Sequence, residues 1–82
     1  MKRWQAIEWL TRAALVLEGF SISAGVDAEF ALTWLFDGAT PEQLKIKARE
    51  IRRHARSTAS IRPAYVLRGR LFVARVLESV ED

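Results

Sequence analysis

The stretch TPEQLKIKAREIRRHARST, from Thr40 to Thr58, carries the clearest helix start in the chain. A threonine followed three residues later by glutamine forms a capping box, in which side chains and backbone at the first turn satisfy each other's hydrogen bonds. Pro41 falls at the first helical position, where its missing N–H costs nothing, and Glu42 puts negative charge at the positive end of the helix dipole. Basic residues fill the last turn. These signals together predict a helix over residues 41–57.

At about 100° per residue, this helix divides into two neighbouring stripes. The narrow apolar stripe consists of Leu44, Ala48, Ile51 and Ala55, and the basic stripe beside it of Lys45, Arg49, Arg52 and Arg56, flanked by Arg53. The basic ridge is about 16 Å long at 1.5 Å per residue. Like charges at this spacing repel one another, and Glu42 and Glu50 are the only carboxylates within the stretch. An anionic partner is therefore favoured over the alternative of a solvated helix face.

Length and charge narrow the classes of protein that fit. The 82 residues form one domain with a small core, residues 1–82, and the formal net charge of +3 is unevenly distributed. Residues 1–40 hold three basic and five acidic residues, whereas residues 41–82 hold ten basic and five acidic ones. The chain has no cysteine and one histidine, so no metal, cofactor or enzymatic activity is predicted.

Two further helices are predicted in the first half of the chain. Residues 3–19 have apolar side chains over about half of the helix circumference, and Asp27 is placed to cap a short, nearly all-apolar helix over residues 27–36. Residues 20–26 are predicted as a connector, and Asp37 and Gly38 as a break. Charged residues interrupt the first apolar segment, so we expect no export signal, no membrane span and a cytoplasmic location.

The C-terminal segment fits two structures. Its apolar residues repeat with helical spacing over residues 64–80, whereas Arg68-Gly69 could instead be the turn of a hairpin over residues 64–76. The first alternative predicts an all-α, compact four-helix domain in which residues 27–36 and 41–57 form a helix-turn-helix-like pair. The second predicts a winged helix. We favour four helices, with a core of Trp9, Leu10, Val16, Leu17, Phe30, Trp34, Leu35, Leu44, Ile51, Phe72 and Val76.

The basic ridge predicts nucleic-acid binding, with duplex DNA as the expected form. The expected phosphate contacts are Lys45, Arg49, Arg52, Arg53 and Arg56, with Arg62, Arg68 and Arg70 as a second cluster. The chain contains no asparagine, so almost no side-chain amide is available to recognise adenine by paired hydrogen bonds. These features suggest a small accessory or regulatory protein that contacts the backbone.

An acidic protein surface is the competing partner. The same arginines would pair with carboxylates, and Trp4, Leu15 and Ile46 are predicted as exposed apolar anchors of such an adaptor or inhibitor. A homodimer is also predicted, because a small domain with this much apolar surface gains stability by pairing.

Overall fold

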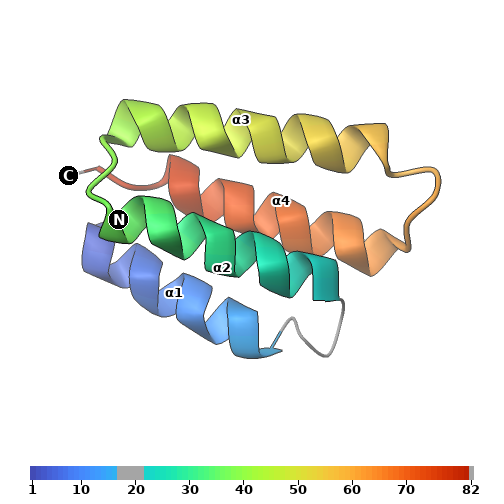
Figure 1. The fold of residues 1–82 in the computed structure, drawn as a ribbon, viewed down its shortest axis with the longest axis horizontal. Helices are drawn as coiled ribbons and strands as arrows, with labels where there is room; N and C mark the ends of the chain where they lie inside the picture. Colours follow the sequence, from blue (N-terminus) through green and yellow to red (C-terminus); the bar gives the residue numbers. More distant parts are fainter. Residues whose placement is uncertain (17–21, 82) are drawn as a thin grey trace.

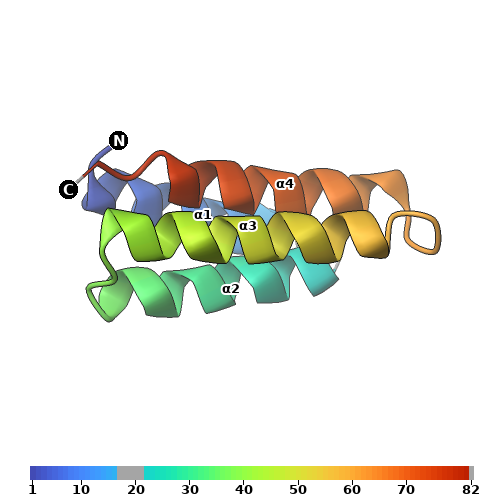
Figure 2. The same ribbon diagram turned by 90° about the horizontal axis from the view of Figure 1, so that it is seen from above.

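Four antiparallel helices make up the described part of the chain. The computed structural model describes residues 1–16 and 22–81, which form α1 (Arg3–Val16), α2 (Ile22–Phe36), α3 (Pro41–Ser57) and α4 (Ala64–Glu78). Successive helices run in opposite directions, and both chain ends lie at the same end of the bundle (Figures 1 and 2). The predicted all-α, four-helix domain is confirmed. The hairpin alternative is wrong, because α4 is one continuous helix in which Gly69 is buried instead of forming a turn.

Helix α3 begins and ends where its sequence predicts. The hydroxyl of Thr40 accepts a hydrogen bond from the backbone N–H of Gln43 (3.2 Å), and Oε1 of Gln43 accepts one from the backbone N–H of Thr40 (2.8 Å). This is the complete capping box, followed by Pro41 in the first turn. Local chemistry alone therefore determines where the basic helix starts.

The turn between α2 and α3 is built on Gly38. Its φ of 75° is in the left-handed region that favours glycine. The backbone N–H of Gly38 donates to the carbonyl of Leu35 and that of Ala39 to the carbonyl of Trp34, a pattern that closes a helix C-terminus. Arg3 of α1 adds hydrogen bonds to the carbonyls of Leu35 (3.2 Å) and Ala39 (2.7 Å), so α1 helps to hold this turn in place.

Helix α2 is longer than predicted. It begins at Ile22, so Asp27 lies inside the helix and does not cap it, and the predicted connector is wrong from Ile22 onward. Residues 17–21, where the predicted first helix ends and the connector starts, lie outside the described residues. Helix α4 ends at Glu78, two residues before the predicted boundary. The position of Asp27 is explained by its tertiary partner, which is described below.

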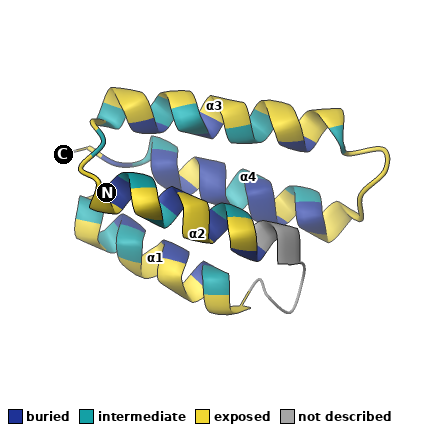
Figure 3. Ribbon diagram, in the orientation of Figure 1, coloured by how far each residue is buried: buried dark blue, intermediate teal, exposed yellow. Residues whose placement is uncertain are grey.

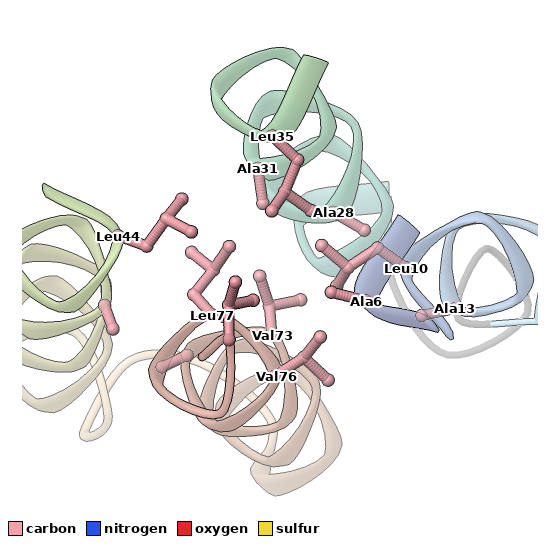
Figure 4. Close-up of a cluster of buried hydrophobic side chains, with 13 residues drawn as sticks. Ala6, Leu10, Ala13, Ala28, Ala31, Leu35, Leu44, Val73, Val76 and Leu77 are labelled. Atoms are coloured by element: carbon pink, nitrogen blue, oxygen red, sulfur yellow. The ribbon is translucent and has the colours of Figure 1, made fainter. Parts of the chain in front are cut away.

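The core is built from small and medium side chains (Figures 3 and 4). Helix α1 contributes Ala6, Leu10 and Ala13; α2 contributes Ala28, Ala31 and Leu35; α3 contributes Leu44 and Ala48; α4 contributes Val73, Ala74, Val76 and Leu77, which Val80 extends. Figure 4 shows side chains from all four helices meeting around Leu77 and Val73. Alanine stripes at a spacing of three or four residues let helices approach closely.

The predicted core is therefore only partly correct. Leu10, Leu35, Leu44 and Val76 are buried, and Trp34, Ile51 and Phe72 are partly buried at the edge of the core. The prediction is wrong for Trp9, Val16 and Phe30, whose side chains are 48%, 63% and 60% exposed. Leu17 lies outside the described residues. The closely spaced alanines leave no room for these larger side chains inside the bundle.

The four helices form two closely packed pairs, α1 with α2 and α3 with α4, which α2 and α4 join across the core. Contacts between α2 and α3 are few, and Trp34 lies between them with Nζ of Lys47 5.1 Å above its ring centroid. The two helices run in opposite directions, and in the view of Figure 1 α4 is drawn between them. The helix-turn-helix-like pairing is not confirmed.

Candidate nucleic-acid interface

The basic stripe of α3 lies toward α4. Arg49, Arg53 and Arg56 are exposed, and Lys45 and Arg52 are half-buried. The apolar stripe beside it faces the core through Leu44, Ala48 and Ala55. The helix therefore lies on the bundle with its arginines outward, as its periodicity predicts.

One carboxylate that the sequence did not place reaches this ridge from α4. Glu78 accepts two hydrogen bonds from Arg52, from Nε to Oε1 at 2.8 Å and from Nη2 to Oε2 at 2.9 Å. The hydrogen bonds from Arg52 hold the pKa of Glu78 below its usual range, with smaller contributions from the charges of Arg52 and Arg49. The same pairing raises the pKa of Arg52. Arg52 is thus paired with α4. Part of the positive charge of the ridge is therefore neutralised by a carboxylate from another helix.

We expect Glu78→Gln to lower the free energy of unfolding at pH 7 by no more than about 1 kcal/mol, because the pair is partly solvated. A lowered carboxyl pKa stabilises the fold above the ordinary value of 4.5 and loses that effect as pH falls through the folded-state pKa. The difference between wild type and variant should therefore shrink in urea titrations as pH falls below 4.5. Glu50→Gln, which breaks an exposed pair with Lys47 within α3, is the control and should change stability by a few tenths of a kcal/mol. An equal difference at pH 7 and pH 3 would contradict the assignment.

Arg70 does not belong to the surface. Its side chain is 7% exposed, and its Nε lies 2.8 Å from Oδ2 of Asp27 on α2. Its Nη1 donates a hydrogen bond to Oγ1 of Thr58 at the end of α3 (3.0 Å), and that hydroxyl donates to the carbonyl of His54. Arg70 thus joins α2, α3 and α4 from within, and its guanidinium is not available to a phosphate. Its assignment to the second cluster is corrected here.

Arg68 has a neighbour that the sequence analysis missed. Arg75 is exposed on the same face of α4, two turns further along, and both arginines line a hollow with Leu71 and Phe72. Glu78, which reaches Arg52, is three residues beyond Arg75, so this face adjoins the α3 ridge. The seven-residue spacing of Arg68 and Arg75 was the available signal. It places the two arginines on one face because the segment is a helix.

Arg62 is exposed in the segment that joins α3 to α4. With it, the structure places a set of arginines on the two adjacent helices and their connection. We call the exposed arginines of the helices the cationic face: Arg49, Arg53, Arg56, Arg68 and Arg75. In the described part of the chain, none of these five forms an ion pair with a carboxylate.

The three residues predicted to anchor a protein partner are exposed but do not form one surface patch. Trp4 and Leu15 are 64% and 72% exposed on α1, and Ile46 is 50% exposed on α3. Helices α1 and α3 lie on opposite sides of the core (Figure 4). Ile46 instead precedes Arg49 and Arg53 by three and seven residues, which places it on the outward side of α3 with these arginines. One interface containing all three anchors is therefore not formed.

An apolar groove runs between α1 and α4, beside the cationic face. It is lined by Trp9, Ala13 and Val16 from α1 and by Phe72 from α4, with Arg12 at its edge, and has a volume of about 320 Å³. The rings of Trp9 and Phe72 meet edge to face, with centroids 6.3 Å apart. We call it the aromatic groove. Trp9 was predicted in the core, so the sequence did not indicate this groove.

The described residues contain no cluster of three or more metal-binding side chains. Nor does any helix among them have the length and apolar character needed to cross a membrane. No protein-family model, no curated protein and no solved structure matches the chain.

Proposed function

We propose that the protein binds nucleic acid through the phosphate backbone, using the cationic face of α3 and α4. The observation that carries the proposal is the juxtaposition of five exposed arginines on two adjacent helices without carboxylate partners in the described residues. Arginine suits this role because its planar fork binds two phosphate oxygens at once. Placing like charges together is unfavourable unless an anion binds them.

This surface is better suited to contacts with the phosphate backbone of a nucleic acid than to recognition of its base sequence. Phosphate contacts fix position on the nucleic acid and carry no sequence information. The chain has no asparagine, and the amide of Gln43 is held in the capping box of α3. Bidentate amide readout of adenine is thus missing from the basic helix. We therefore propose an accessory or regulatory role, in the cytoplasm, without enzymatic activity.

Salt dependence tests the proposal. Four to six phosphate contacts predict a log–log slope of binding to random duplex DNA of roughly −4 to −5 against monovalent salt. The double substitution Arg49→Ala and Arg53→Ala removes two contacts and should make the slope shallower by about 2. Lys45 and Arg52 are unsuitable targets, because both contact carboxylates. Absence of binding to random duplex at about 50 mM salt would refute the proposal.

Ile46→Ser is the matched control, because it alters the same outward side of α3 without changing charge. Nucleic-acid affinity should stay nearly unchanged. The control also tests the second candidate function, docking on an acidic protein, which is favoured by the position of a half-exposed isoleucine beside Arg49 and Arg53. An isoleucine anchor in a protein complex would cost about 1–2 kcal/mol of binding energy when replaced by serine.

We also propose a homodimer, which would double the cationic face. Its basis is the amount of apolar surface on a small domain, including Trp4, Leu15 and Phe36. Light scattering at tens of micromolar protein measures the mass directly, and a monomer at that concentration would remove the proposal.

A further inference from the structure

The aromatic groove and the hollow that contains Arg68 and Arg75 share one residue. Phe72 lines the groove together with Trp9 and Val16, and it also lines the neighbouring hollow with Arg68 and Arg75. The two hollows have volumes of about 320 and 300 Å³ and lie next to each other along α4. An exposed aromatic surface therefore adjoins two arginines that have no ion-pair partner among the described residues.

Each component matches one part of a nucleotide. A base presents a flat apolar face, which aromatic side chains bind by stacking, and its phosphate is bound by arginine. Trp9 is 48% exposed, so part of its ring is accessible at the groove. The groove is at the small end of the range for ligand pockets, which suits a single base.

We infer that the protein binds single-stranded nucleic acid, with one base stacked on Trp9 in the aromatic groove and the flanking phosphates on Arg68 and Arg75. This inference rests on the proposed backbone binding and names its preferred substrate. A duplex keeps its bases paired inside the helix, so it can use the cationic face but not the groove. Arg68 and Arg75 beside the groove also favour an anionic strand over an uncharged apolar ligand, whereas Arg12 is paired with Glu8.

The stacked base gives single strands an added affinity. Base stacking on an aromatic side chain is worth roughly a 5- to 150-fold change in binding for each base. The contribution tolerates any base, because every base has a stacking face. A pyrimidine homopolymer of about 20 nucleotides is therefore a suitable probe, and a random duplex of equal length is its comparison.

The experiment measures the affinity of both probes by fluorescence anisotropy at low salt, with wild type, Trp9→Leu and Trp4→Leu. Trp9→Leu should weaken binding of the single strand roughly 5- to 150-fold and leave duplex binding within about twofold. Trp4→Leu is the matched control, since Trp4 lies on α1 outside the groove and is exposed. It should change neither affinity. Trp9→Phe, which keeps an aromatic ring, should restore most single-strand binding.

Fluorescence gives a readout that a purely structural role of Trp9 would not produce. The chain has three tryptophans, so Trp4→Phe with Trp34→Phe leaves Trp9 as the only one. Its emission should be quenched by the single strand and not by the duplex. Circular dichroism and urea unfolding of each variant confirm that the fold is retained.

The outcomes separate the two proposals. If Trp9→Leu changes neither affinity, or lowers both equally, the single-strand inference is overturned and backbone binding stands. If wild type does not bind the duplex at about 50 mM salt, backbone binding itself fails, and the inference, which rests on it, fails with it. Binding of an amphipathic peptide in the groove, without any binding of the single strand, would assign the groove to a protein partner.

Discussion

Replacing Arg70 by methionine is expected to lower the free energy of unfolding by about 3 kcal/mol or more at pH 7. The substitution keeps much of the side-chain volume but leaves the half-buried carboxylate of Asp27 without its cation. It also removes the hydrogen bond to Thr58. Removing one member of a buried ion pair is costly because the remaining charge loses its compensation. Urea titrations of wild type and variant measure the difference.

The effect of Arg70→Met should depend on pH in a defined direction. In wild type, burial raises the pKa of Asp27, although the charge and contact of Arg70 and the charge of His54 act to lower it. A raised carboxyl pKa means that the folded state holds the proton more tightly, so the contribution of Asp27 to stability is largest below its ordinary value of 3.8 and is lost as pH rises through the folded-state pKa. Without Arg70 that pKa rises further. The variant should therefore approach wild-type stability in acid.

The reciprocal variant tests the same contact from the other side. Asp27→Leu leaves the guanidinium of Arg70 buried, and an arginine cannot escape the penalty by losing its proton. In acid, wild-type Asp27 is protonated and no longer compensates Arg70, so the destabilisation by Asp27→Leu relative to wild type should also shrink as pH falls. The double variant, Asp27→Leu with Arg70→Met, removes both charges and should recover at least half of the loss. Additive losses in the double variant would show that the two side chains do not interact.

The geometry of the pair explains why this recovery is expected. Nε of Arg70 and Oδ2 of Asp27 are 2.8 Å apart, but neither atom is in an aligned hydrogen bond. A buried pair needs well-directed hydrogen bonds to offset desolvation. The contact therefore specifies how α2 meets α4 more than it stabilises the bundle.

The features predicted correctly from the sequence are those set by interactions between residues close together in the chain. The start of α3 follows from a capping box and a proline within four residues, and its inner and outer faces follow from the regular spacing of apolar and charged side chains. No tertiary contact was needed for either result. The cationic residues of α3 were accordingly placed on the surface correctly.

The rotation of α1 and α2 could not be predicted in the same way. Apolar side chains cover half of α1 and most of α2, so periodicity leaves several faces that could point inward. Size then suggested Trp9 and Phe30, whereas the bundle uses Ala6 and Ala31 and keeps the rings outside. The distance between the packed helices determines which face of α1 and α2 points to the core. That distance is a property of the assembled bundle.

The pairing of charged residues also could not be predicted from the sequence. Asp27 and Arg70 are 43 positions apart in the chain, and Arg52 and Glu78 are 26 apart. A sequence shows that both signs are present but not which residues meet. Arg70 was therefore predicted among the phosphate contacts and Arg75 was not, although the exposed position of Arg75 follows from the helical register of α4.

Leu77→Ala is expected to lower the free energy of unfolding by about 2–5 kcal/mol. Leu77 is fully buried on α4 at the centre of the core, near Leu44 and Val73 in Figure 4. Truncation removes apolar contacts and leaves a cavity, since alanine-lined helices that already touch have little freedom to close it. A small domain has a total stability of about 5–15 kcal/mol, so the loss is a large fraction of it.

Two control variants separate cavity formation from a general effect of substitution. Leu77→Met keeps the volume and should cost less than about 1.5 kcal/mol, and Leu15→Ala, at a side chain that is 72% exposed, should cost no more than about 0.5 kcal/mol. All three are measured by urea unfolding with a common slope. Because Leu77 faces away from the cationic face, folded Leu77→Ala protein should keep its affinity for nucleic acid under conditions where it remains native. A cost of Leu77→Ala no greater than that of Leu15→Ala would mean that α4 does not occupy the centre of the bundle.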